Sequence, residues 1–169
     1  MAKQEKEYSV PEKLANLYKL QLLVSEIDRI KSLRGKLPQE VEDMEAELAK
    51  FQEKIQKYHQ ELNEAKARIN SFHGRIDEAN ALIEQYTSQM DEVQNNKQYD
   101  FLTKEIEFQN LEIELANKRI RENMEIVDEL NAKIHNSLED IDDRRSALEI
   151  KKGELDEITA ENRTEEESS

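Results

Sequence analysis

Apolar residues recur along residues 41–93 at alternating spacings of three and four. If heptad position a is placed at residue 41 and at every seventh residue after it, every a and d position in this stretch is apolar. These residues are Val41, Met44, Leu48, Phe51, Ile55, Tyr58, Leu62, Ala65, Ile69, Phe72, Ile76, Ala79, Ile83, Tyr86, Met90 and Val93. An apolar period of 3.5 residues is typical of an α-helix that supercoils against another helix. The pattern therefore predicts one long helix whose apolar seam faces a partner helix.

A second apolar series begins after the polar stretch 94–98. Continuing the first series would place Lys97 and Asp100 in the seam, so the phase changes here. Nine residues at a spacing of seven are all apolar, which predicts a helix over about 98–158. They are Tyr99, Ile106, Ile113, Ile120, Val127, Ile134, Ile141, Leu148 and Leu155. The positions three residues later include five polar residues, which lower stability and fix register: Gln109, Asn123, Ser137, Arg144 and Lys151.

An antiparallel pairing of the two stretches aligns residues whose numbers add up to 192. The pairing joins Val93 to Tyr99, Ala65 to Val127 and Met44 to Leu148, and every a position then faces a d position. Asn95 and Asn96 tolerate left-handed backbone angles, which suits a tight turn between helices. We predict an all-α fold: a long antiparallel coiled-coil helical hairpin over 38–158 with its turn near 94–98. A swapped dimer would bury the same layers, so the oligomeric state stays open.

The N-terminal part predicts an additional helix. Ser9 and Glu12 match the S-x-x-E capping box, and dense apolar residues follow from Leu14 to Leu33. So many apolar positions need more than one neighbouring helix to cover them. We therefore expect residues 9–37 to form a helix and turn that packs at the base of the hairpin.

Helix-breaking residues and changes in composition indicate the remaining boundaries between segments. Gly35 suits a C-cap with positive φ, and Pro38 suits the first turn of a following helix. We expect the chain to turn or kink here. We expect the polar residues 1–8 to be flexible. The acidic stretch 159–169 is expected to be frayed, because it lacks apolar residues at seam positions.

Charge and composition narrow the classes of function. The 169 residues carry a formal net charge of -14, and 38% are charged. Residues 1–37 carry eight Lys or Arg against five Asp or Glu, whereas residues 38–169 carry seventeen against thirty-four. The acidic part is a poor surface for nucleic acid, because phosphate neutralisation dominates such binding. We expect no membrane association, since neither a signal peptide nor a long apolar run is present. The expected location is cytoplasmic.

The sequence contains few residues in patterns typical of catalytic, metal-binding or cofactor-binding sites. It contains no cysteine, which excludes disulfides and thiolate metal sites in this stretch. His59, His73 and His135 lack a second ligand at a metal-binding spacing and are expected to be exposed. We find no glycine-rich phosphate loop and no nucleophile–base motif. We therefore expect no enzymatic activity, no catalytic, cofactor-binding or metal-binding residues, and no cofactor in this chain.

A second apolar stripe lies off the seam of the second helix. Phe101, Phe108 and Leu115 occupy c positions, and Leu111 occupies an f position. Exposed apolar patches on soluble helices usually mark interfaces, although scattered apolar residues also occur on ordinary surfaces. The stripe is a candidate surface for a protein partner or for a second copy of this chain as a homodimer.

The turn resembles a bacterial family in which a coiled-coil hairpin precedes a C4-type zinc ribbon. The family pattern V-x-[ST/N]-N-[KR]-E-Y-x-x-L-x-x-E-I-E matches here at Val93, Asn96, Lys97, Tyr99, Leu102, Glu105, Ile106 and Glu107, with Gln98 in place of the usual Glu. The stretch Leu111–Leu115 is similar to the Bacteroidetes-like branch. The resemblance implies an adaptor, with the role in nucleic acid or transcription assigned to the ribbon. It also implies a zinc ribbon, and zinc in the parent protein, beyond residue 169.

Asn96, Lys97 and Tyr99 have two interpretations at the turn. Either they satisfy turn chemistry, with Tyr99 packing in the first layer, or they dock a partner together with Phe101. The preferred function is a non-enzymatic adaptor or scaffold for a protein partner that the sequence does not name. The alternatives are a structural spacer or dimerisation rod, and a coiled-coil chaperone.

Overall fold

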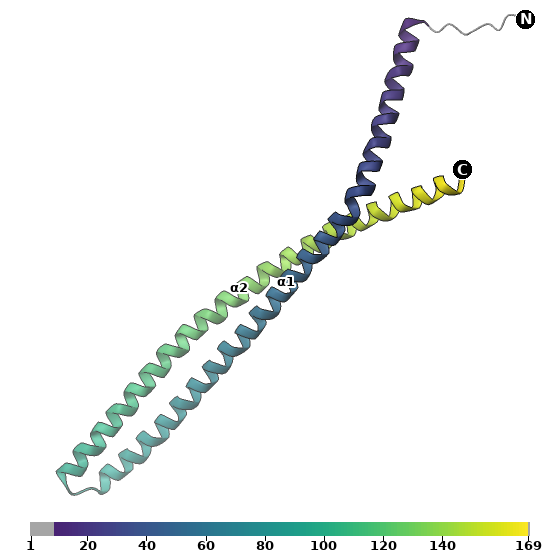
Figure 1. Ribbon diagram of the computed structural model, residues 1–169. Helices are drawn as coiled ribbons and strands as arrows, with labels where there is room; N and C mark the ends of the chain where they lie inside the picture. The colour runs from purple at the N-terminus through teal and green to yellow at the C-terminus, as the bar shows by residue number, and fades with distance from the viewer. Residues whose placement is uncertain (1–8, 169) are drawn as a thin grey trace, which may run out of the picture. The chain divides into compact units, whose positions relative to one another are not determined.

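The computed structural model describes the backbone of residues 9–168 and the side chains of residues 9–161. Two helices account for almost all of this part of the chain: α1 at Val10–Glu92 and α2 at Asn96–Ser168 (Figure 1). No strand occurs among the described residues. The prediction of an all-α helical hairpin is confirmed. The chain divides into two compact units, residues 50–141 and residues 1–49 with 142–169.

Helix α1 begins where the sequence predicts. The Lys13 N–H donates to the carbonyl oxygen of Ser9 at 3.0 Å, which is the first helical hydrogen bond. The Ser9 N–H donates to Glu12 Oε2 at 3.3 Å. A glutamate three residues into a helix that bonds back to the N-cap backbone is one half of a capping box. Ser9 is therefore the N-cap of α1.

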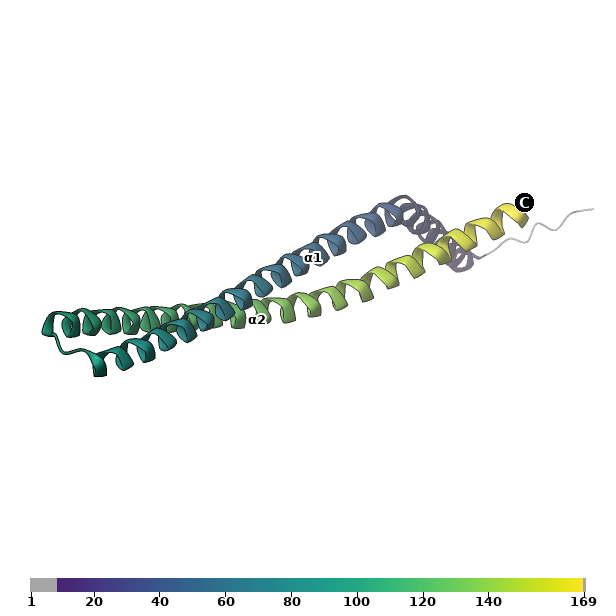
Figure 2. The same cartoon turned by 90° about the horizontal axis from the view of Figure 1, so that it is seen from below.

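In the unit of residues 50–141, the two helices lie side by side along their apolar seams (Figures 1 and 2). Ile55, Leu62, Ala65 and Ala79 of α1 are buried, and the other seam residues of α1 are at least half-buried. Alternation of three and four residues places these side chains in one stripe. The prediction of a continuous seam is confirmed over this unit.

The predicted register also holds in this unit. Leu62 of α1 forms a buried cluster with Leu130 and Ile134 of α2, and Tyr58 and Val127 pack against it. Leu62 with Leu130 and Tyr58 with Ile134 are pairs whose numbers add up to 192. The Lys133 ammonium also lies 5.9 Å from the centre of the Tyr58 ring. The contacts between the two helices therefore agree with the alignment that the sequence predicts.

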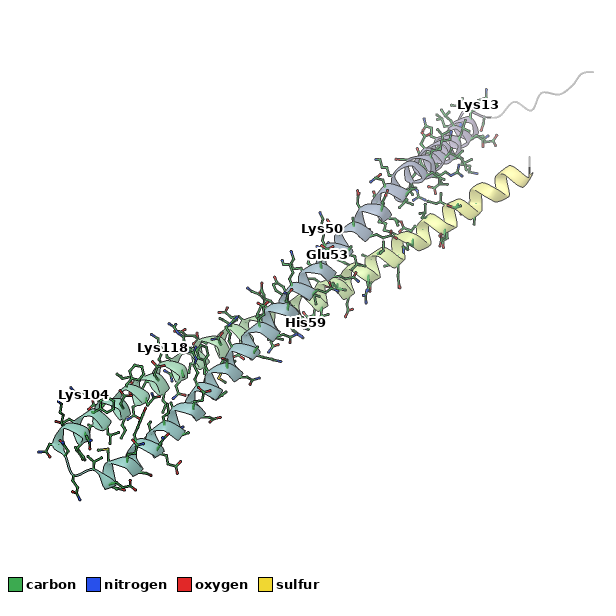
Figure 3. All side chains as sticks on the ribbon, turned by 60° about the horizontal axis from the view of Figure 1, so that its bottom comes forward. Lys13, Lys50, Glu53, His59, Lys104 and Lys118 are labelled. Atoms are coloured by element: carbon green, nitrogen blue, oxygen red, sulfur yellow. The ribbon has the colours of Figure 1, made fainter. Side chains whose placement is uncertain are left out.

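Charged and polar side chains cover the outside of these helices. Lys50, Glu53 and His59 of α1 and Lys104 and Lys118 of α2 are all exposed (Figure 3). His135 is exposed too, and its Nε2 lies 3.2 Å from Glu139 Oε1, one turn along the same helix. Ion pairs at this spacing on an exposed helix face add only about 0.3 kcal/mol to the stability of the helix. Stability comes from the seam rather than from these surface pairs.

In the other unit, the same seam continues in both helices. Val41 of α1 and Leu148 of α2 are buried, and Leu37 is fully buried. Lys151, a polar seam position, reaches Glu40 with its Nζ 3.3 Å from Oε2, and Arg144 pairs with Glu47. Long side chains bury their aliphatic stems while their charged ends stay at the surface. The polar seam residues here are accommodated by cross-helix ion pairs.

Of the turn or kink expected at Gly35–Pro38, the turn does not occur. Helix α1 runs through these residues without interruption, with Pro38 inside the helix and no positive φ at any described residue. An internal proline removes a backbone hydrogen bond and bends a helix. Figure 1 shows α1 changing direction in its dark-blue part. Burial of Leu37 and Val41, on either side of Pro38, offsets the cost of keeping the helix intact.

The expected packing of a separate N-terminal helix is likewise not observed. Residues 10–37 are the first turns of α1 itself, and large apolar residues between Val10 and Ile27 remain exposed by 49–70% of their surface. Burial begins only at Ile30 and Leu33, which are half-buried. The sequence predicts that these apolar residues need covering neighbours, but among the described residues no helix covers them.

The C-terminal boundary also differs from the prediction. Helix α2 continues past Ile158 to Ser168, whereas the sequence predicted fraying from residue 159. Ala, Glu and Arg are strong helix formers, so the helix extends without an apolar seam. The apolar period marks where a helix packs and not where it ends. The prediction for residues 1–8 lies outside the described residues.

Candidate functional site

The turn between the helices is built by Asn95. Helix α1 ends at Glu92, and α2 begins at Asn96. The Lys97 N–H donates to Asn95 Oδ1 at 2.8 Å, and the Tyr99 N–H donates to the Asn95 carbonyl oxygen at 3.0 Å. This is the geometry of an asparagine N-cap. The left-handed backbone expected at Asn95 or Asn96 is absent, since no described residue has a positive φ.

Replacing this cap should destabilise the turn. We expect Asn95→Ala to lower the free energy of unfolding by about 1 kcal/mol, because it removes the acceptor for an N-terminal N–H of α2. Urea unfolding followed by circular dichroism measures the change. The neighbouring variant Gln94→Ala is the control, because Gln94 is exposed and is not the residue that caps α2. Equal effects of the two variants would show that the cap contributes nothing.

The predicted tip residues separate into two groups. Lys97 contributes its backbone N–H to the cap, and Asn96 is the first residue of α2. Tyr99 was predicted to occupy a seam position opposite Val93, yet 49% of its surface stays exposed. It lies within the first turn of α2, where the facing helix has already ended. Tyr99 is therefore a surface residue of the tip rather than a buried layer.

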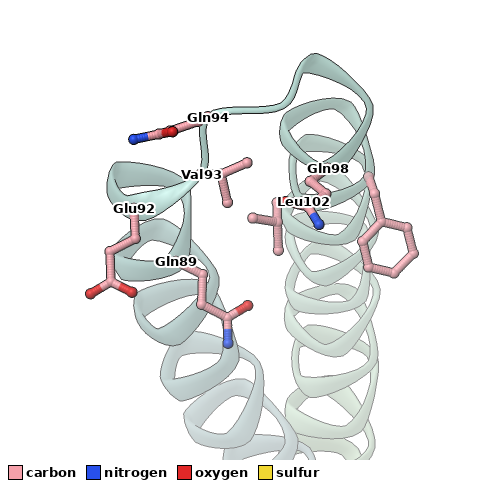
Figure 4. A pocket seen from close by; sticks show the side chains of 7 residues that line it. Gln89, Glu92, Val93, Gln94, Gln98 and Leu102 are labelled. Atoms are coloured by element: carbon pink, nitrogen blue, oxygen red, sulfur yellow. The ribbon is translucent and has the colours of Figure 1, made fainter.

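An open groove of about 580 Å³ lies at the tip between the two helix ends. Val93 and Leu102 point toward each other across it, whereas Glu92 points outward (Figure 4). Side chains from both helices line it: Gln89, Glu92, Val93, Gln94, Gln98, Phe101 and Leu102. The groove thus combines an apolar floor with amide groups and one carboxylate at its rim.

Two smaller grooves follow along the hairpin from the tip. One has a volume of about 270 Å³ and is bordered by Leu82 and Phe108; the other, of about 200 Å³, is bordered by Phe72 and Leu115. Arg75 lines both. Its guanidinium carbon lies 5.7 Å from the centre of the Phe72 ring. Such a position over an aromatic face is weakly attractive and helps to hold the arginine in place.

The three grooves share one edge of the hairpin. The α1 residues Arg75, Leu82 and Gln89 are seven apart, and so are Phe101, Phe108 and Leu115 of α2. We call the surface formed by these three grooves and the α2 residues beside them the Phe101–Leu115 edge. Residues seven apart lie two turns along the same face of a helix. The edge therefore carries a repeating row of apolar positions on α2, and on α1 it carries Leu82 between Arg75 and Gln89.

The second apolar stripe is exposed, as the sequence predicts. Phe101, Phe108, Leu111 and Leu115 keep between 44 and 62% of their surface accessible. Leu111 lines none of the three grooves and lies beside the edge rather than in it. The α1 side of the edge was not found from the sequence. Its signal was Leu82, an apolar residue outside the a and d positions.

The described part of the chain contains no group of three or more His, Cys, Asp or Glu residues that could hold a metal ion. None of the helices, over the same residues, has a stretch both long and apolar enough to cross a lipid bilayer. In comparisons with protein-family models, curated proteins and solved structures, nothing matched this chain.

Proposed function

We propose that this chain is a non-enzymatic protein-interaction adaptor or scaffold that holds a partner protein on the Phe101–Leu115 edge. The observation that carries the proposal is the row of exposed Phe101, Phe108 and Leu115, each beside a groove between the helices. Aromatic side chains next to a cavity are the usual anchors of protein interfaces. These residues are not needed for packing between the two helices, because they occupy c positions outside the seam.

The repeat along the edge indicates what kind of partner fits. Seven helical residues rise about 10.5 Å, so the three apolar positions are evenly spaced along the hairpin. An amphipathic helix presents anchors at a matching spacing and inserts them into a groove. Arg75, Glu78 and Glu112 add charges of both signs beside the grooves. We infer that the partner is an amphipathic helix with mixed charges along its polar flanks.

The resemblance at the turn extends the proposal. If the chain is similar in function to the coiled-coil and zinc-ribbon family, the hairpin holds a partner while a zinc ribbon beyond residue 169 contacts nucleic acid or the transcription machinery. This extension depends on the turn residues between Val93 and Glu107. Reading the gene past codon 169 tests it, because two CxxC pairs are required for the ribbon.

Negative charge placed on the Phe101–Leu115 edge should weaken partner binding strongly. We expect Phe101→Glu with Phe108→Glu to keep its helical circular dichroism, because both side chains are exposed, and to lose a partner retained by the unmodified chain. Affinity capture from the source organism, followed by mass spectrometry, identifies the retained protein. Binding of that purified protein by calorimetry should then weaken at least tenfold, as expected when two anchor residues are removed.

A matched variant separates this surface from general apolarity. Met124→Glu with Leu138→Glu places the same charges on exposed residues at e positions, away from the grooves. This control should bind like the unmodified chain. Equal binding by both variants would contradict the assignment of the edge. Failure of the unmodified chain to retain any protein would favour the spacer or dimerisation rod.

A further inference from the structure

We propose that a second copy of this chain packs on α1 along residues 20–30, forming a parallel two-stranded coiled coil. The seam of α1 keeps its phase toward the N-terminus, with one charged residue, Arg34, at the a position between Ile30 and Leu37. Leu20 and Ile27 fall on a positions, and Leu23 and Ile30 fall on d positions, in the heptads that contain Val41. This strip has the spacing that buries the rest of α1 against α2.

Helix α2 leaves most of this strip exposed, and only Ile30 at its end is half-buried. Leu20, Leu23 and Ile27 keep between 51 and 61% of their surface exposed. In the register of the hairpin, the residues assigned opposite Ile30 and Ile27 are Asn162 and Glu165, which are both polar. A polar residue opposite a seam position gives no apolar surface to pack on. Among the described residues, the strip therefore extends the seam of α1 beyond the apolar residues of α2 that pair with it.

Apolar exposure on α1 is not confined to the strip. Nine large apolar residues between Val10 and Ile27 are about half exposed or more. Exposed apolar side chains gathered on one helix usually mark an interface. Continuity with the seam that packs against α2 makes Leu20, Leu23 and Ile27 the part of this surface that a second α1 helix covers.

Charge complementarity favours pairing of this strip with the same strip of a second copy, with the two helices parallel. Glu26 occupies a g position and Lys31 the e position five residues later. Parallel in-register helices pair g with the following e of the neighbour, so each Glu26 meets a Lys31. An antiparallel pairing of the strip would place Glu26 against Glu26. The Arg29 side chain donates to Glu26 Oε1 at 2.7 Å and lowers the Glu26 pKa, so this residue is charged at neutral pH.

Single cysteines test the pairing and its direction, because the chain contains none of its own. In a parallel dimer the two copies of residue 20 are adjacent, so Leu20→Cys should form a covalent dimer under mild oxidation. In the antiparallel alternative these residues lie about 15 Å apart along the helices, beyond the reach of a disulfide. Ser25→Cys, at an f position on the opposite face, is the control and should stay monomeric on a denaturing gel.

Light scattering on the full chain gives the second measurement. We expect a mass of twice 19.9 kDa for the unmodified chain. Leu23→Glu with Ile27→Glu should halve this mass while the helical signal is retained, because both side chains are exposed. A monomeric unmodified chain, or a dimer that survives in this variant, would overturn the proposal. Phe101→Glu with Phe108→Glu should leave the dimer intact, so failure of the docking edge and failure of this interface are distinguishable.

Discussion

Leu130→Ala should lower the free energy of unfolding of the hairpin by roughly 2–5 kcal/mol. Leu130 is 4% exposed and packs with Leu62 and Ile134 in the buried cluster of the 50–141 unit. Truncation loses the transfer free energy of the side chain and leaves a cavity. Two paired helices have no second layer that could collapse into that space. Urea unfolding followed by circular dichroism measures the change.

Leu111→Ala is the matched control for this prediction. It makes the same chemical change in the same helix, but Leu111 is 62% exposed. Surface substitutions of this kind usually change stability by no more than about 0.5 kcal/mol. A small effect at Leu130, similar to that at Leu111, would mean that the two helices do not pack through this cluster. The comparison thus tests the hairpin itself.

Arg68→Met should destabilise the same unit by about 1–3 kcal/mol. Asn123 occupies a d position in α2 and is only 7% exposed. Its Oδ1 accepts a hydrogen bond from Arg68 Nε of α1 at 2.8 Å, and its Nδ2 donates to the Arg119 carbonyl oxygen at 2.8 Å. Removing the Arg68 donor leaves a buried amide oxygen without its cross-helix partner. The cost is that of desolvating the oxygen.

A second substitution isolates this hydrogen bond. Arg68→Met combined with Asn123→Leu should recover most of the lost stability, because replacing both partners by apolar groups removes the unsatisfied oxygen. Arg119→Met controls for the loss of an arginine, since only its backbone carbonyl bonds Asn123, while its side chain pairs with Glu122 at the surface. If Arg119→Met is as harmful as Arg68→Met, the buried hydrogen bond is not the cause.

For the polar residues in the seam, the sequence predicts their positions but not the residues of the other helix that they contact. The heptads located Asn123, Arg144 and Lys151 in the seam and predicted that they limit register. The partners come from the other helix: Arg68, Glu47 and Glu40. Each lies one residue away from the layer that faces its polar partner. Long side chains reach diagonally across a helix pair, which a layer-by-layer alignment does not predict.

The sequence predicted the α2 side of the candidate site but not its α1 side. The sequence located Phe101, Phe108, Leu111 and Leu115 outside the seam, because their spacing contradicts the a and d positions. It did not locate the grooves beside Phe101, Phe108 and Leu115, which need side chains of α1 such as Arg75 and Leu82. Grooves between two helices depend on which residues face each other across the edge. That information is in the packing rather than in either helix alone.

The sequence by itself determined the two paired arms of the hairpin, the turn near 94–98 and the alignment of the arms. Apolar spacing of three and four residues is a local property of the chain, and a single phase change at 94–98 separates the two series. The tertiary structure alone decided that α1 passes through Gly35–Pro38. Local signals favour a break there, but burial of Leu37 and Val41 on both sides outweighs the cost of an internal proline. The same structure showed that the apolar N-terminal turns of α1 find no cover within the described residues, because exposure depends on the neighbours that folding supplies.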